Sequence, residues 1–174
     1  VRRPLRDVAH ARVGHGRVKV VGIDERPLVL RVHRPWFDAI AHGHKTVEYR
    51  SVDELQAAIG AVKRDLFADL AGADVVEVGM GPGPSLPLFQ EAGVRAVRGI
   101  EPNVEMHPLA TARAAQCGLR RLQLSTGVAE ELPLPDDSCD VLVATMLMCS
   151  VASPPRALQE FARVLRPGGR YIFI

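Results

Sequence analysis

Three glycines and two acidic residues make up the part of the sequence with the clearest capacity for chemistry. The stretch VGMGPGPS contains Gly79, Gly81 and Gly83, and Glu77 comes one residue before it. Glycines at this density let a ligand lie against bare backbone, because no Cβ atoms stand in the way. Glu101 follows 18 residues after Gly83. A carboxylate at that place can accept both hydroxyl groups of a ribose.

The spacing of the glycines excludes two phosphate-binding motifs. A P-loop needs a Lys directly after its last glycine, and none follows here. The dinucleotide motif needs a third glycine, but that position holds Pro84 when counted from Gly79 and Leu86 when counted from Gly81. Glu77 would repel a pyrophosphate, yet it can accept hydrogen bonds from an ammonium group. A ligand with a cationic amino-acid end, a ribose and no phosphate is S-adenosylmethionine, which these residues favour over a turn that serves packing alone.

Alternating strands and helices are predicted to position these residues. Apolar, β-branched runs alternate with helix-like stretches from residue 52 onward, which predicts an α/β fold with a doubly wound, mostly parallel sheet. Ligands bind such sheets at the carboxyl ends of the strands, where the glycine loop would lie. The predicted strands are 74–79, 95–101, 121–127, 139–146 and 170–174, and the predicted helices are 52–72, 85–93, 103–118 and 153–169.

Four motifs in order give the second half of the chain a family resemblance. They are VVEVGMGPG, GIEPN, GVAEELPLPDDSCDVLVAT and ARVLRPGGRYIFI. From about residue 55 to its end, the chain resembles the class I S-adenosylmethionine-dependent methyltransferases of methyltransferase type 11, which have a Rossmann-like sheet. Within that family, KRDLFADL, ATMLMCSV and RVLRPGG are most similar to the methyltransferase-like proteins that methylate small thiols.

The resemblance implies cofactor-binding roles for residues in four loops. They are Glu77, Gly79, Gly81 and Gly83 around the methionine part, Glu101 at the ribose, Pro102, Asn103, Val128, Ala129 and Glu130 around the adenine, and Thr145 near the sulfonium. Val128 stands where the family usually has an aspartate, so a side-chain bond to the adenine amino group is lost. The thiol-methylating relatives also lack that aspartate. The resemblance identifies no catalytic residue in this chain, and the segment from Thr145 to Ser150 should approach the methyl acceptor.

The expected function is methyl transfer from S-adenosylmethionine to a small-molecule nucleophile, most readily a thiol. The segment TMLMCSV is mostly apolar and has no His, Asp, Glu or Lys that could act as a general base. Among methyl acceptors, a thiol has the least need of such a base. The family sheet usually continues with a sixth and an antiparallel seventh strand. We expect this sheet to be truncated after its fifth strand, which would then be an unpaired apolar edge. The alternatives are a non-catalytic cofactor-binding domain and an RNA-associated protein.

The first part of the chain differs in charge from the rest. Residues 1–50 hold 11 Lys and Arg against 5 Asp and Glu, and residues 51–174 hold 11 against 15. We therefore predict a basic N-terminal segment, 1–51, and a methyltransferase domain, 52–174. Within the first part, a strand, a short helix from Trp36 to Ala41 and a second strand from Thr46 are expected.

One run in the basic segment suggests a second partner. Gly43, Lys45, Glu48 and Arg50 give this segment a partial resemblance to the ASCH domain, whose cleft faces RNA or a nucleoside. That resemblance implies possible nucleic-acid contacts through residues 20–50. A solvated charged strand is the alternative interpretation.

Cysteine usage and hydropathy indicate a cytoplasmic protein. Cys117, Cys139 and Cys149 form no Cys-x-x-Cys pair, and apolar neighbours predict reduced core thiols in a reducing compartment. No apolar run approaches the ~18 residues of a transmembrane span. The six histidines show no metal-ligand spacing, so no metal site is predicted.

Overall fold

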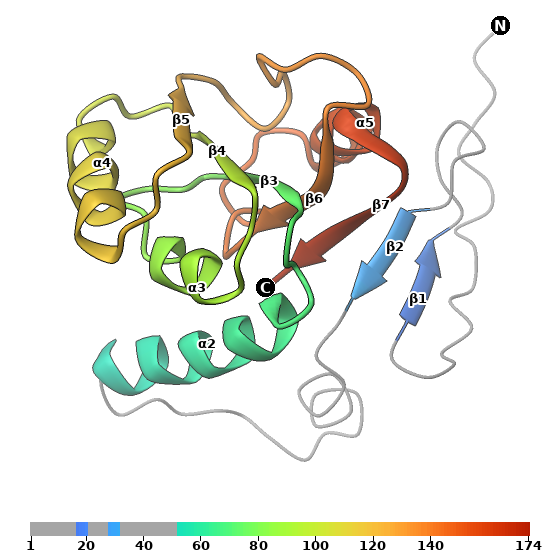
Figure 1. The fold of residues 1–174 in the computed structure, drawn as a ribbon. Coiled ribbons are helices and arrows are strands. Elements are labelled where there is room, and N and C mark those ends of the chain that lie inside the picture. Colours follow the sequence, from blue (N-terminus) through green and yellow to red (C-terminus); the bar gives the residue numbers. More distant parts are fainter. Residues whose placement is uncertain (1–16, 21–27, 32–51) are drawn as a thin grey trace, which may run out of the picture.

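A computed structural model of the protein describes residues 17–20, 28–31 and 52–174. Strands and helices alternate from residue 52, as the sequence predicts (Figure 1). In chain order the elements are β1 (Arg17–Val20), β2 (Leu28–Arg31), α2 (Val52–Phe67), β3 (Asp74–Val78), α3 (Leu86–Glu91), β4 (Ala96–Ile100), α4 (Met106–Cys117), β5 (Leu122–Ser125), β6 (Cys139–Ala144), α5 (Pro154–Val164) and β7 (Leu165–Phe173).

The described strands form one sheet in the order β1-β2-β7-β6-β3-β4-β5. Every neighbouring pair from β2 to β5 is parallel, and β1 runs antiparallel to β2. The chain winds outward from β3 through β4 to β5, then returns to the other side of β3 for β6 and β7. The strand order therefore reverses between β3 and β6, and in open α/β sheets ligands bind at the carboxyl end of such a reversal.

The edge of the parallel core differs from the prediction. β2 pairs with β7 in parallel, placing Val29 opposite Arg170 and Arg31 opposite Ile172. The expectation that the fifth strand of the parallel core would be unpaired is therefore wrong. Unpaired N–H and C=O groups on β7 offer a template for another strand, and the short apolar run LVLR fills it. The domain boundary at residue 51 stays a prediction.

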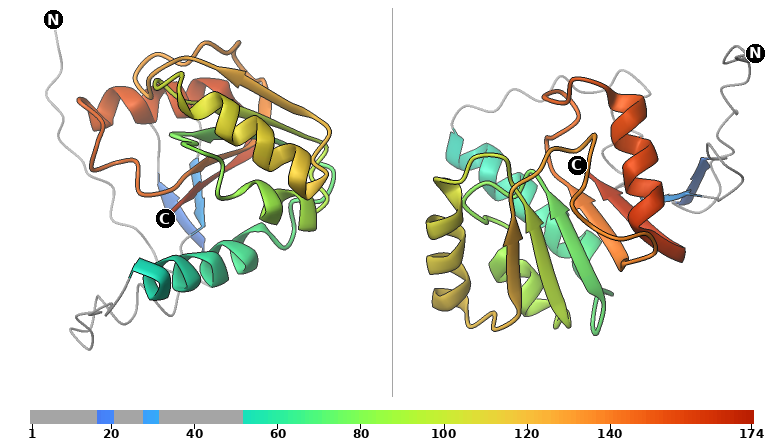
Figure 2. Two further views of the ribbon diagram at one scale, coloured as in Figure 1. Left: turned by 90° about the vertical axis from the view of Figure 1, so that its left-hand side faces the viewer. Right: turned by 90° about the horizontal axis from the view of Figure 1, so that it is seen from above.

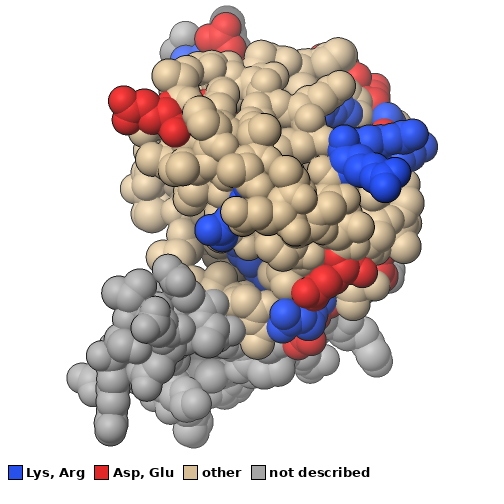
Figure 3. Space-filling view, turned by 60° about the vertical axis from the view of Figure 1, so that its left-hand side comes forward, with Lys and Arg blue, Asp and Glu red and all other residues tan. Residues whose placement is uncertain are grey.

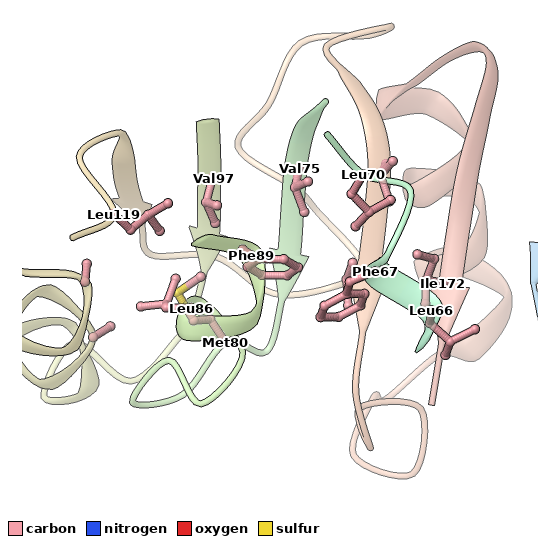
Figure 4. Close-up of a cluster of buried hydrophobic side chains, with 14 residues drawn as sticks. Leu66, Phe67, Leu70, Val75, Met80, Leu86, Phe89, Val97, Leu119 and Ile172 are labelled. Carbon is pink, nitrogen blue, oxygen red and sulfur yellow. The ribbon is translucent and has the colours of Figure 1, made fainter. Parts of the chain in front are cut away.

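Helices cover both faces of the sheet, as expected for a doubly wound fold (Figure 2). Alternation along β3 sends Val75 to one face and Val76 to the other. The face under α2, α3 and α4 holds the larger cluster of buried side chains, where the rings of Phe67 and Phe89 stack with centroids 4.7 Å apart (Figure 4). The opposite face packs against α5, where the ring of Phe161 lies 5.2 Å from that of a β7 tyrosine.

Three predicted helix boundaries are wrong. α2 ends at Phe67, whereas the predicted helix runs to residue 72. α4 begins at Met106, whereas the predicted helix begins at Asn103, whose Oδ1 accepts the Glu105 N–H at 3.0 Å in a turn before the helix. α5 ends at Val164 and β7 follows at once, whereas the predicted helix runs to residue 169. Pro167 explains this early end, because proline disfavours the helical conformation in the residue before it.

Several predictions concern residues that the structure does not describe. The predicted helix from Trp36 to Ala41 and the ASCH-like residues Lys45, Glu48 and Arg50 lie outside them. Within the described ranges, no helix is both long and apolar enough to cross a membrane, and no His, Cys, Asp and Glu side chains gather into a metal-binding group.

The three cysteines do not share one environment. Cys139 is buried and Cys117 is half-buried, as core thiols should be. Cys149 is exposed, so the prediction of three core thiols is wrong for that residue.

Candidate functional site

Strand register gathers the predicted site residues at one edge of the sheet. Val78, at the end of β3, lies opposite Ile100 of β4 and Ala144 of β6, and Ile100 in turn lies opposite Ser125 of β5. The residues that follow these four strand ends must therefore emerge in one row. They are Gly79, Glu101, the loop from Thr126 to Glu131, and Thr145.

The glycine loop runs close to its neighbours. Gly79 has φ +70° and donates its N–H to the carbonyl of Ile100 at 2.8 Å. A Cβ on Gly79 would lie 2.8 Å from Cδ1 of Leu147, and a Cβ on Gly83, where φ is +75°, would overlap Leu86. Only glycine accepts both this backbone conformation and this close approach without strain.

Glu101 joins the glycine loop to the end of β4. Its Oε2 accepts the Gly81 N–H at 2.8 Å, and its Oε1 accepts the Asn103 N–H at 2.9 Å. These two bonds fix the plane of the carboxylate at the edge of the sheet, and the side chain stays half-buried. Pro102 and Asn103, which follow it, are both exposed.

Glu77 lies beneath the glycine loop, only 2% exposed. Its Oε1 accepts the Ser85 hydroxyl at 2.5 Å, and the Lys63 ammonium nitrogen lies 4.0 Å from the same oxygen. Its Oε2 has no hydrogen-bond partner among the described residues. Burial raises the pKa of Glu77, while the nearby Lys63 acts in the opposite direction. Burial likewise lowers the pKa of Lys63, against the pull of Glu77.

The loop after β5 presents an apolar side chain to solvent. Val128 is 48% exposed, while its neighbour Ala129 is buried against the core on the α5 side. Glu130 turns away, because its Oε1 accepts the Ser153 N–H at the start of α5 at 3.0 Å. That backbone hydrogen bond lowers the pKa of Glu130. Of the three predicted adenine-side residues in this loop, Val128 is therefore the one with an exposed side chain.

The segment after β6 lies between the sheet edge and α5. The hydroxyl oxygen of Thr145 is buried, and it too has no hydrogen-bond partner among the described residues. Met146 has φ +49°, a strained value for a residue with a side chain, and it is exposed. Leu147 and Met148 pack partly against the core on the α5 side, and Cys149 is exposed.

Two contributors to this site are absent from the sequence-based prediction. Lys63 comes from α2 and Ser85 from the residue before α3, and both are buried beside Glu77. A signal for Lys63 exists in the sequence, since it lies four residues from both Ile59 and Phe67 on the apolar face of α2. A lysine that is buried on an apolar helix face needs a hydrogen-bond or charged partner.

Charged side chains are scattered over the face of the molecule that Figure 3 shows. On the face shown in Figure 3, Lys and Arg side chains lie in separate groups with uncharged surface between them. A nucleic-acid surface usually carries a continuous basic patch or stripe. The RNA-associated alternative depends on residues 20–50, most of which lie outside the described residues, and it stays a prediction.

Comparison with known proteins identifies the family. Residues 76–173 match the model of the methyltransferase domain family, which includes every predicted site residue described above. The chain belongs to this family. This confirms the resemblance seen in the sequence motifs, whereas the ASCH resemblance stays a prediction.

The relatives of this methyltransferase domain differ in their named acceptors. Phosphatidylethanolamine N-methyltransferase of Cereibacter sphaeroides is 38% identical over 104 residues, covering 59% of this chain and 50% of that protein. Thiol S-methyltransferase TMT1B of Homo sapiens is 37% identical over 122 residues, covering 64% and 48%. A solved S-adenosylmethionine-dependent methyltransferase of Mesorhizobium loti has a TM-score of 0.56 and 27% identity, covering 65% of this chain and 51% of that one. The chain thus spans about half the length of these relatives.

Proposed function

We propose that this chain binds S-adenosylmethionine and forms the cofactor-binding part of a methyltransferase acting on a small-molecule nucleophile, most readily a thiol. The observation that carries the proposal is the Glu101 carboxylate, held beside the glycine loop at the carboxyl ends of β3 and β4. The family match and the switch point between β3 and β6 support the same ligand position.

Glu101 retains the acceptor capacity that a ribose needs. An ionised carboxylate offers about four acceptor positions on its two oxygens. The N–H groups of Gly81 and Asn103 occupy one position on each oxygen. One position on each oxygen therefore stays open, which matches the neighbouring 2′ and 3′ hydroxyls of a ribose.

The amino-acid end of the ligand fits the polar atoms left open at this edge. Oε2 of Glu77 and Oγ1 of Thr145 are buried without a described partner, and such groups in a folded protein call for a ligand or water. Glu77 suits the α-ammonium group of the cofactor. Gly79 and Gly83 leave room that a Cβ atom would fill, so the backbone can approach the ligand closely.

Bound S-adenosylmethionine supplies an electrophilic methyl group on a sulfonium, which leaves as a neutral thioether. The chain's own task is then to align the acceptor and to exclude water. Leu147 provides apolar surface next to Gly79, and the Met146 side chain is exposed. The segment from Ala144 to Val151 has no His, Asp, Glu or Lys. A thiol has a pKa near 8.5 and is about a few per cent thiolate at neutral pH, so it needs no dedicated base.

Calorimetry of S-adenosylmethionine binding tests the proposal. Glu101→Ala should weaken binding by about 2–4 kcal/mol, roughly 30- to 900-fold, because two charge-assisted hydrogen bonds are lost and water replaces them only in part. Glu105→Ala is the matched control, since it removes the same charge from an exposed side chain that makes no capping bond. Equal affinity in the Glu101 variant would remove Glu101 from the site, and tighter binding of NAD would overturn the ligand assignment.

A panel of acceptors tests the chemistry. The full-length protein should turn over thiols faster than phenols, amines or carboxylates. Preferred turnover of a phenol or a carboxylate would contradict the thiol assignment. Cofactor binding without turnover of any acceptor would favour the non-catalytic alternative, which the half-length match to the relatives also leaves open.

A further inference from the structure

A buried polar chain connects three elements beneath the glycine loop. The ammonium group of Lys63, on α2, donates to the hydroxyl oxygen of Ser85 at 2.6 Å. That hydroxyl donates to Oε1 of Glu77, on β3, at 2.5 Å. Lys63 is 4% exposed and Ser85 is fully buried, so water does not replace these bonds. This series of hydrogen bonds ends at Glu77, two residues before Gly79, the first glycine of the loop.

The geometry of Ser85 points away from a purely structural role. Ser85 is the N-cap residue of α3, where a serine usually accepts a backbone N–H of the first helical turn. Here it makes no such bond, because its hydroxyl is engaged with Lys63 and Glu77. The Ser85 hydroxyl therefore orients Glu77 and does not cap the helix.

The buried charges themselves add to this argument. A buried ion pair seldom stabilises a protein more than well-packed apolar side chains of the same volume would. Lys63 and Glu77 nevertheless lie within an otherwise apolar cluster between the sheet and the helices α2 and α3. With Oε1 engaged, Oε2 of Glu77 is the acceptor left without a partner. An arrangement of this kind is suited to holding a cation that arrives from outside.

We propose that Lys63 and Ser85 are positioning residues for Glu77, whose carboxylate they orient and whose charged form they favour, so that Oε2 receives the α-ammonium group of the cofactor, directly or through one water molecule. This inference rests on the proposed function, since it assumes that S-adenosylmethionine occupies the carboxyl edge. On this inference, the preference for a ligand with an α-amino group depends on Lys63 of α2, which acts on the ligand only through Ser85 and Glu77. Without Lys63, burial would leave Glu77 protonated and a poor partner for a cation.

Lys63→Met tests this in the whole chain, because methionine fills nearly the same space without charge. The ligands are S-adenosylhomocysteine and its analogue with hydrogen in place of the α-amino group, both measured by calorimetry. We expect the variant to bind S-adenosylhomocysteine at least ten-fold more weakly and the deamino analogue within three-fold of the wild type. A merely structural role would weaken both ligands by the same factor, which would overturn the inference.

Two further variants keep the test decisive. Ser85→Ala removes the hydroxyl that links Lys63 to Glu77. It should likewise weaken binding of S-adenosylhomocysteine more than binding of the deamino analogue. This variant replaces Lys63→Met if that protein does not fold. In a Glu77→Gln background, Lys63→Met should have no further effect on that selectivity, and an undiminished effect would refute the link through Glu77. A wild-type protein that binds neither ligand would instead overturn the proposed function and the inference together.

Discussion

The two edges of the parallel sheet carry charged side chains in opposite ways. At the amino edge, Asp74 accepts two hydrogen bonds from Arg95, at 2.7 and 2.5 Å, and Asp140 accepts one from Arg166 at 2.6 Å. A hydrogen bond from the Asp74 N–H to the Asp140 carboxylate, at 2.8 Å, connects the Asp74–Arg95 pair with the Asp140–Arg166 pair. At the carboxyl edge, by contrast, the buried Oε2 of the Glu77 carboxylate has no described partner, and neither does the Thr145 hydroxyl. The buried atom without a described partner at the amino edge is the uncharged hydroxyl of Ser138.

This difference separates stability from function. A hollow of about 380 Å³ lies at the amino edge, beside Asp140, Arg166 and Arg170. The carboxylates and guanidinium groups around it satisfy one another, so a ligand would have to break existing bonds to enter. At the carboxyl edge a buried carboxylate oxygen, Oε2 of Glu77, has no described partner, and the glycine loop exposes its backbone. A cleft alone is thus a weaker indication of function than unmet hydrogen-bonding capacity.

The largest effect that would sharpen this comparison is expected from the glycines. Gly83→Ala should lower the free energy of unfolding by about 2–5 kcal/mol, because the left-handed backbone costs about 1–2 kcal/mol and the overlap with Leu86 adds about 1–3. Gly72→Ala is the matched variant at the amino edge, with φ +73° and open space around its Cβ position. Gly72→Ala should lower the free energy of unfolding only by the cost of the left-handed backbone, about 1–2 kcal/mol. Denaturant unfolding measures both, and equal losses would show that the loop packs loosely.

A smaller effect is expected from the ion pairs of the amino edge. The hydrogen bonds from Arg95 hold the pKa of Asp74 below its usual value. A lowered folded-state pKa means that stability is present above the unfolded pKa of ~3.9 and is lost as the pH falls through the folded value. Asp74→Asn should therefore cost about 1–2 kcal/mol at pH 7, at the lower end for charged bonds because Arg95 is half-exposed.

The pH dependence is the decisive part of that measurement. The difference in unfolding free energy between wild type and Asp74→Asn should shrink as the pH falls below ~3.9, where the wild-type carboxylate also takes up a proton. Binding of S-adenosylmethionine should be unchanged at pH 7, since the two edges are separated by the length of a strand. A weaker cofactor affinity in this variant would contradict the division between the edges.

The sequence predicts most of this architecture because local patterns suffice for it. The β-branched run before Gly79 and the spacing from Gly83 to Glu101 place the loop and the acid at neighbouring strand ends. The contact of β2 with β7 was beyond prediction, since a four-residue strand with three apolar residues can pair with any open edge of suitable length. Lys63 was overlooked for another reason: a lysine is ordinarily a surface residue, whatever its place in the helical pattern, and its partner Glu77 lies on another element.

The smallest expected effect concerns Val128, at the rim of the carboxyl edge. If the ribose lies at Glu101, the adenine extends toward the loop after β5, where the exposed Val128 offers no hydrogen bond. Val128→Asp should therefore strengthen S-adenosylhomocysteine binding by only about 0.5–1 kcal/mol, roughly two- to five-fold, as one partly solvated bond to the adenine amino group forms. The Glu131 carboxylate, three residues along in a bridge with residue 128, limits this gain by repelling the new charge.

The N6,N6-dimethyl analogue of S-adenosylhomocysteine makes the Val128 measurement specific. Its adenine nitrogen has no hydrogen left to donate, so Val128→Asp should not strengthen its binding and should weaken it slightly, since an aspartate replaces apolar surface. Val128→Asn is the control for charge, because it keeps an acceptor oxygen without the repulsion from Glu131. Equal changes for both ligands would place the adenine elsewhere, and the ribose assignment at Glu101 would then rest on the Glu101→Ala affinity alone. A gain confined to the unmodified adenine would instead fix the direction in which the cofactor crosses the edge, from Glu77 past Glu101 to Val128.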